Sequence, residues 1–345
     1  MDVALDVDAG AMHVDGGLAE VLRRSTEATL TGRVLAVVIE TTGSTYARAR
    51  DAALYAAGRR VAGWLTGGCL EDWLAQQACD TATPDHVHWL ELDQRGESTL
   101  LDPSAPGCRG RQHIAFIPLD RWQGWSDCVQ AWQDGVGALS LQCDPRHGVT
   151  ASCGAHGTSR VPGAAAPAWL PAPRTLSLPQ PPTLALIGGG PEAPLVLQMA
   201  AELGWRTIGV ENRPRWMARV DQADIVLPIS VDAFFATPHS ARCAAILAMS
   251  HNVERDVLAL EGAATTAARY VGLLGPRARR DDVLRLLGAD THAALHGRLR
   301  APVGLPFAAR GPAAIATSVV AHLLMEFAGE RDRDAPCGAD PRRGP

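Results

Sequence analysis

The chain has 345 residues and a net charge of −5, and 47% of its residues are hydrophobic while 20% are charged. This length exceeds what one ordinary hydrophobic core supports, so we expect two globular domains. The acidic balance argues against bulk attraction to nucleic acid or to an anionic membrane, and no apolar run is long enough to span a bilayer. The sequence contains no lysine, which excludes a lysine Schiff base and a P-loop lysine.

The N-terminal stretch and the cysteines indicate the cellular compartment of the protein. The stretch MDVALDVDAG is acidic and lacks the basic start and apolar core of a secretion signal, so we expect a cytoplasmic protein. The eight cysteines are scattered without a CxxC pair, which predicts free thiols. A zinc site made of Cys143, His147, Cys153 and His156 has a spacing that fits no common pattern, and we interpret these residues as strand and loop.

Residues 15–157 are expected to form a first domain of mixed α/β structure. Helical spacing over residues 17–28 precedes RVLAVVIE, a buried strand that runs into the polar turn TTGSTYARAR. The short strands ALY and RVAGWL follow, and then helical spacing over residues 70–78. The strands HVHWLELD and RQHIAFIPL flank the loop QRGESTLLDPSAPGCRG, and the helix VQAWQD and the strand GALSLQC complete the domain.

A change in composition separates this part from a second domain. Residues 158–182 are dense in proline and alanine, which predicts an interdomain linker because proline cannot donate ladder hydrogen bonds. Residues 183–329 alternate apolar strands with amphipathic helices, a pattern typical of a Rossmann-like, doubly wound parallel sheet. Residues 330–345 are expected to be a disordered tail.

The second domain begins with a glycine-rich turn, in the stretch LALIGGGPEAPLVLQMA. Gly188, Gly190 and Ala193 lie between a strand and a helix, in the G-x-G-x-x-A spacing of a dinucleotide fingerprint. Glu211 follows the next strand, where an acceptor for a ribose hydroxyl belongs. The turn is therefore a candidate phosphate or nucleotide site, and the alternative is a turn that only connects strand to helix.

A second candidate in this domain is AMSHNVERDVLAL. Ser250 and His251 follow a buried strand at its carboxyl end, where open α/β sheets place ligands. His251 would carry a proton or bind a phosphate. In the alternative, Ser250 or Asn252 caps the next helix and the histidine has no chemical role.

The first domain contains the stretch VAGWLTGGCLEDW. Gly67 and Gly68 would let a ligand approach the backbone, and Cys69 would lie near a helix N-terminus, whose dipole favours a thiolate. The alternative is that Cys69 fills space in the core.

A second thiol occurs in the stretch APGCRGR. Cys108 is flanked by glycines and by Arg109 and Arg111, which would favour a thiolate and bind phosphate. The alternative is an ordinary loop cysteine.

These stretches together resemble the XdhC/CoxI family of xanthine dehydrogenase accessory factors. The resemblance covers residues 32–328 and is carried in order by ETTGSTY (Glu40–Tyr46), GWLTGGCLE (Gly63–Glu71), GCRG (Gly107–Gly110), GGGPEAPL (Gly188–Leu195) and ENRP (Glu211–Pro214). The stretches SHN, YVGLLGPRARR and APVGLPFAARGPAAIATS match the remaining blocks of the family. The motif around Cys69 is the most specific of them.

The resemblance implies a chaperone that binds the molybdenum cofactor (molybdopterin), supports its sulfuration with a cysteine desulfurase and inserts it into the large subunit of a molybdenum hydroxylase. Cys69 and Cys108 would contact molybdenum, and the turn at Gly188 and Gly190 with Glu211 would hold the phosphate or nucleotide end. We expect these sulfurs and the glycine turn to face one cleft between the domains. A homodimer is also expected, and no catalytic residue is assigned.

Two alternative functions remain at this point. The fingerprint with Glu211 and His251 suits an NAD(P)-dependent oxidoreductase. Departures from the family pattern suit a divergent paralogue that only binds partners; they lie at Arg50, Asp51, Arg109, Pro306, Ala308 and His322 and in GESTLLDPS.

Overall fold

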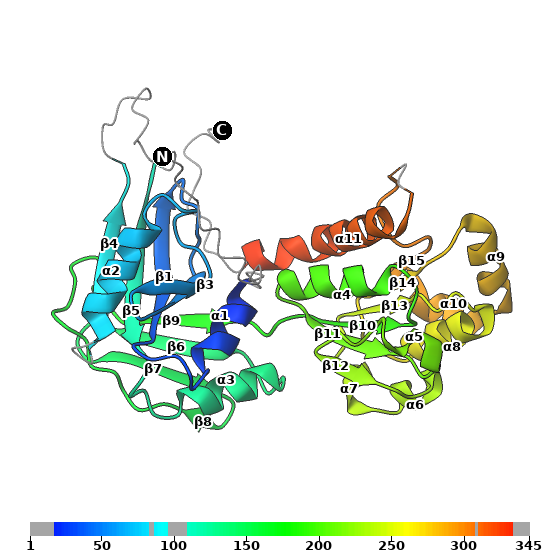
Figure 1. Cartoon of the computed structure of the whole chain (residues 1–345), viewed down its shortest axis with the longest axis horizontal. Helices are drawn as coiled ribbons and strands as arrows, with labels where there is room; N and C mark the ends of the chain where they lie inside the picture. The colour runs from blue at the N-terminus through cyan, green and yellow to red at the C-terminus, as the bar shows by residue number, and fades with distance from the viewer. Residues whose placement is uncertain (1–16, 83–85, 96–108, 308–309, 334–345) are drawn as a thin grey trace, which may run out of the picture.

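The computed structural model describes residues 17–82, 86–95, 109–307 and 310–333. Figure 1 shows two domains side by side, the first built on two antiparallel sheets and the second on one parallel sheet covered by helices. Within the described residues, no helix is long and apolar enough to cross a membrane. The α/β fold class expected from the sequence is confirmed.

The first domain packs its two sheets face to face. One sheet has the strand order β3-β2-β1-β5-β4 and the other β8-β7-β6-β9, and every pair within them is antiparallel. The elements are α1 (Gly17–Ser25), β1 (Val34–Gly43), β2 (Ala52–Ala56), β3 (Arg59–Ala62), α2 (Glu71–Ala82), β4 (His88–Asp93), β5 (Gly110–Pro118), α3 (Trp125–Gln133), β6 (Leu139–Asp144), β7 (Gly148–Cys153), β8 (His156–Gly157) and β9 (Arg174–Leu178).

Both faces of β1 are buried, which explains its continuous run of Val, Leu and Ile. Val34 and Val38 share a hydrophobic cluster with Leu74 of α2. Leu35 and Val37 point to the opposite face, into the cluster that includes residues of β6 and β7. Strand β1 therefore lies between helix α2 on one side and the second sheet on the other.

The predicted linker at residues 158–182 belongs largely to the first domain. Strand β9 joins the second sheet beside β6, and its alternating pattern buries Leu176 and Leu178. Leu170 is buried, and the Trp169 ring stacks on the His113 imidazole at a centroid distance of 4.3 Å. The prolines lie on either side of RTLSL and leave that strand free to pair, so the connection between domains shortens to the residues between β9 and β10.

The second domain has a six-stranded parallel sheet in the order β12-β11-β10-β13-β14-β15. Numbered from β10, this is the order 3-2-1-4-5-6 of a Rossmann fold. The elements are β10 (Thr183–Ile187), α4 (Ala193–Glu202), β11 (Arg206–Val210), α5 (Pro214–Met217), β12 (Ile225–Leu227), α6 (Val231–Phe235), α7 (Pro238–Ala241), β13 (Ala245–Ala248), α8 (Val253–Ala264), β14 (Tyr270–Leu273), α9 (Arg277–Leu286), α10 (Ala289–Leu295), β15 (Leu299–Arg300) and α11 (Pro312–Arg333).

Helices α4 and α11 cover one face of this sheet, and α6 and α8 cover the other. Helix α11 extends to Arg333, four residues beyond the predicted end of the domain at residue 329. Residues 334–345 of the predicted tail lie outside the described residues.

Two arginines join the domains. The Arg206 guanidinium donates to the Gln133 carbonyl, and Arg242 Nη1 donates to the Asp134 carbonyl at 2.8 Å. Both acceptors lie at the C-terminus of α3, where the helix dipole favours a cation. The arginines lie at the amino ends of β11 and β13, so the amino edge of the parallel sheet faces the first domain.

Candidate functional site

The Cys69 thiol lies in a turn directly before helix α2, as the sequence predicts. Gly67 and Gly68 have φ angles of +65° and +109°, which residues with a side chain adopt only at a cost. A Cβ on Gly67 would also lie 2.7 Å from the Tyr46 ring. Cys69 itself is exposed, so it is not a core filler.

A buried carboxylate holds this turn. Glu71, which is 7% exposed, accepts hydrogen bonds from the Leu65 amide at 3.1 Å and the Thr66 amide at 2.9 Å. Its second oxygen accepts from the Tyr55 hydroxyl at 3.0 Å. Burial, together with the Glu71 carboxylate, raises the pKa of Tyr55, so the phenol stays protonated and keeps donating. The loop is therefore fixed before any ligand arrives.

The other motif stretches of the first domain lie against this turn. Gly43, at the end of β1, pairs with Gly110, at the start of β5. A Cβ on Gly110 would lie 2.4 Å from Thr45 Cγ2, so the two stretches are in close contact. Arg109 is exposed next to Gly110, while Cys108 lies outside the described residues.

The six cysteines in the described ranges are free thiols. Of these six, Cys69 and Cys79 are exposed, and Cys128, Cys143, Cys153 and Cys243 are buried. Burial raises the pKa of Cys143 and of Cys243 to about 12, which keeps both as inert thiols. Among the residues that the structure describes, no group of three metal-ligating side chains comes together, so molybdenum contact by Cys69 stays a prediction.

The Cys69 sulfur has two polar neighbours. Its thiol donates to the Thr66 carbonyl at 3.2 Å, and the Gln94 side-chain amide lies 3.9 Å from the sulfur. These contacts orient the thiol and leave it accessible to a ligand.

In the second domain, the glycine-rich turn lies at the carboxyl end of β10. A Cβ on Gly188, whose φ is +113°, would lie 2.4 Å from the Cα atom of Ser250. A Cβ on Gly189 would lie 2.4 Å from the Trp216 carbonyl oxygen. Ala193 is fully buried at the first residue of α4, which fits its predicted packing role. Internal packing therefore already requires these small residues, without a bound nucleotide.

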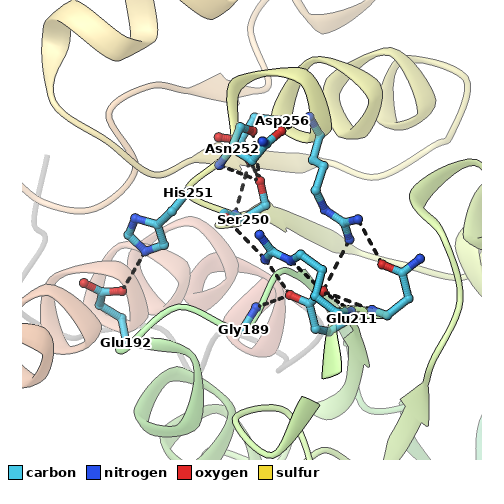
Figure 2. Close-up of polar contacts among 10 residues, drawn as sticks. Gly189, Glu192, Glu211, Ser250, His251, Asn252 and Asp256 are labelled. Atoms are coloured by element: carbon cyan, nitrogen blue, oxygen red, sulfur yellow. Dashed lines mark hydrogen bonds and ion pairs between the residues drawn. The ribbon is translucent and has the colours of Figure 1, made fainter. Parts of the chain in front are cut away.

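Glu211 is fully buried and has many donors around it (Figure 2). Its carboxylate accepts from the backbone amides of Gly189 at 2.9 Å, Asn212 at 3.0 Å and Arg213 at 2.9 Å. The Arg213 guanidinium donates twice, at 2.9 and 2.6 Å, and Arg255 lies 3.5 Å away. Burial raises the pKa of Glu211, but these donors outweigh it and hold the pKa at about 2. The predicted ribose acceptor thus has its oxygens already engaged.

Ser250 belongs to a second buried carboxylate cluster. Its hydroxyl donates to Asp256 Oδ1 at 2.5 Å, and its amide lies 3.2 Å from the same oxygen. Arg279 of α9 donates to the other oxygen of Asp256 at 2.6 Å. Ser250 therefore anchors the start of α8 and does not point into solvent, since it is only 2% exposed.

His251 lies over the glycine turn (Figure 2). It has a φ of +55°, and its Nε2 lies 3.3 Å from Glu192 Oε2. A Cβ on Gly190 would lie 2.5 Å from that same Nε2, so the imidazole fills the space that a pyrophosphate would approach. Asn252 caps α8 by accepting from the Arg255 amide at 2.9 Å, as the capping alternative predicts.

The two candidate regions lie on different sides of the molecule. Helix α2 lies on the side of the first domain turned away from the second (Figure 1). The turn with Gly188 lies at the carboxyl edge of its sheet, and the amino edge contacts the first domain through Arg206 and Arg242. Within one chain, the expectation that Cys69 and the glycine turn face one interdomain cleft is therefore wrong.

Two family models and a relative of known name match this chain. Residues 31–87 match the model of the XdhC and CoxI family, and residues 184–323 match that of the XdhC Rossmann domain. A relative from Bacillus subtilis, described as a probable xanthine dehydrogenase subunit, is 25% identical over 327 residues, which cover 85% of this chain and 92% of the relative.

The fold also matches a solved structure. A crystal structure described as a xanthine dehydrogenase from Bacillus halodurans aligns with a TM-score of 0.74 at 22% identity, over 92% of this chain and 98% of that one. At this identity the match supports the fold alone. The two family models and the order of the motifs show that this chain belongs to the XdhC/CoxI family.

Proposed function

We propose that this chain is an accessory factor for a xanthine dehydrogenase-like molybdenum hydroxylase. It binds the molybdenum cofactor as cargo, supports its sulfuration and inserts it into the large subunit of the client enzyme. The family and the name of the Bacillus subtilis relative support the association with xanthine dehydrogenase. The function is that of a carrier, with no catalytic residue assigned.

The observation that carries the proposal is the exposed Cys69 thiol on a rigid turn. The hydrogen bonds of Glu71 to the Leu65 and Thr66 amides hold the turn in place, so little conformational entropy is lost when a ligand binds. A thiolate is a soft ligand and suits the molybdenum of the cargo, whose own ligands are sulfurs. Cys69 would hold the metal end, and Cys108 and Arg109 would lie on the neighbouring stretch.

The second domain supports a scaffolding role better than dinucleotide chemistry. Glu211 would have to give up donors to accept a ribose hydroxyl, and His251 covers Gly190. For this reason we place the oxidoreductase alternative second. The glycine turn and Glu211 remain the proposed contact for a phosphate or nucleotide end of the cargo, reached from another molecule or after His251 moves.

The test compares two exposed thiols. Apo-protein is loaded with molybdenum cofactor released from a molybdoenzyme, and bound molybdenum per chain is measured by mass spectrometry after gel filtration. We expect Cys69→Ala to reduce bound molybdenum at least tenfold, and Cys79→Ala, the matched control, to bind as the unmutated chain does. Equal loading of the unmutated chain and Cys69→Ala would remove the proposed role of this thiol.

The proposed partners are the large subunit of the client and a cysteine desulfurase, met in the cytoplasm, and a second copy of this chain in a homodimer. Analytical ultracentrifugation tests the dimer directly. Sulfuration is tested by adding the loaded carrier to apo-hydroxylase with and without the desulfurase and cysteine. Activation that does not depend on the desulfurase would contradict that part of the proposal.

A further inference from the structure

A hollow of about 360 Å³ lies on the first domain between α2 and the turn that joins β2 to β3. Its wall includes Gly58, Arg59, Arg60, Trp64, Gly68 and Asp72. Gly68 directly precedes Cys69, so the hollow lies next to the turn that carries the exposed thiol. Its volume falls at the lower end of the range of small-molecule sites, roughly 300–1,000 Å³.

One side of the hollow is rigid. The Arg60 guanidinium stacks on the Trp64 ring at 3.4 Å and donates to the Gly63 carbonyl at 3.0 Å. Glu71, which also lines the hollow, accepts hydrogen bonds from two backbone amides of the loop. These side chains shape the site, and their polar groups are already engaged.

Two other charges in the wall are free. Arg59 and Asp72 are exposed, and neither makes a hydrogen bond or an ion pair with any residue that the structure describes. They line the same hollow without pairing with one another. A ligand with a hydrogen-bond donor edge at one end and an anion at the other would satisfy both charges at once.

A phosphorylated pterin has this chemistry. Its aminopyrimidinone edge presents two adjacent N–H donors, which match the two oxygens of a carboxylate, and its phosphate matches a guanidinium. The ring system is planar and suits a site with an indole in its wall. We propose that the hollow binds the pterin of the cargo, with Asp72 reading the aminopyrimidinone edge and Arg59 binding the phosphate; this rests on the proposed function.

The experiment uses two fluorescent probes that differ only in the phosphate. The full chain is titrated with neopterin monophosphate and with neopterin, and binding is followed by fluorescence anisotropy. We expect Arg59→Gln to weaken the binding of neopterin monophosphate roughly tenfold and to leave the binding of neopterin unchanged, because only the first probe carries a phosphate. Asp72→Asn should weaken both probes by a similar factor.

The controls are Arg277→Gln and Asp232→Asn, which change exposed residues of the second domain and should leave both affinities unchanged. Arg59→Lys should restore part of the phosphate affinity. If the unmutated chain binds neither probe, or if Arg59→Gln and Asp72→Asn bind both probes as the unmutated chain does, the hollow is not a pterin site.

Neither probe contains molybdenum or a dithiolene, so Cys69→Ala should bind both normally. This separates the two proposals. If the unmutated chain binds both probes as expected but takes up no molybdenum cofactor, the carrier function is overturned and the pterin site stands. Normal loading that depends on Cys69, with no probe binding, would overturn the pterin site alone.

Discussion

Replacing Glu211 by glutamine should destabilise the second domain by about 3 kcal/mol at neutral pH. The carboxylate is fully buried, and the Arg213 guanidinium and three backbone amides hold its pKa at about 2 against an ordinary value of 4.5. At about 1.4 kcal/mol for each pH unit, this difference gives roughly 3 kcal/mol of stability from the charged form. Glutamine keeps the shape, removes the charge and leaves Arg213 without its partner.

The pH dependence follows from the lowered pKa. The unfolded carboxyl binds a proton near pH 4.5 and the folded one near pH 2, so the contribution is complete above about pH 5 and is lost as the pH falls toward 2. The difference in the free energy of unfolding between the unmutated chain and Glu211→Gln should therefore fall to about half at pH 3.

The assay is thermal and urea unfolding, followed by circular dichroism at pH 7 and pH 3. At pH 7 we expect a fall in the melting temperature of roughly 5–10 °C for a domain of this size. Glu261→Gln, an exposed change on α8, is the control and should unfold like the unmutated chain. An equal loss for Glu211→Gln at both pH values, or no loss at pH 7, would show that the charge of Glu211 does not stabilise the domain.

Two further predictions concern the turn and the domain contact. Gly188→Ala should lower the free energy of unfolding by more than about 3 kcal/mol, because the φ of Gly188 is +113° and the new Cβ would lie 2.4 Å from the Cα of Ser250. Gly190→Ala should lower it by less than about 1 kcal/mol, because its Cβ would meet the ends of the His251 and Glu192 side chains, which can move. Thermal unfolding measures both, and equal losses would contradict the packing explanation. The double variant Arg206→Ala, Arg242→Ala should loosen the domain contact and raise the radius of gyration in small-angle X-ray scattering. An unchanged scattering curve would show that these two arginines do not hold the domains together.

The periodicity of the second domain predicted its fold well. Short apolar strands such as TLALI alternate with amphipathic helices, and each strand takes its place in one parallel sheet. The linker was harder to predict, since proline dominates the composition of residues 158–182. The period-two pattern of RTLSL was the signal for β9, but its partner β6 lies more than thirty residues away, and pairing over that separation is not visible locally.

The site was predicted in part. The turn with Cys69 lies at the start of a helix as expected, because a glycine pair followed by helical spacing is a local signal. The anchoring role of Glu71 was missed, although it stands only two residues after the thiol, because its partner Tyr55 is on another strand. The spacing of Glu211 from the glycine turn was informative, and Arg213 stands only two residues after it, but the contact of the carboxylate with the Gly189 amide joins two strand ends and could be placed only by the fold.

The position of β9 decides where this protein can be divided. A fusion or truncation breakpoint at residue 157 would strip an edge strand from the first half and expose the unpaired backbone of β6, which invites aggregation. It would also leave the second half with a proline-rich N-terminal extension that contains the unpaired strand β9. Separate expression of the two halves should succeed only with a cut after Leu178, where the chain crosses from one core to the other.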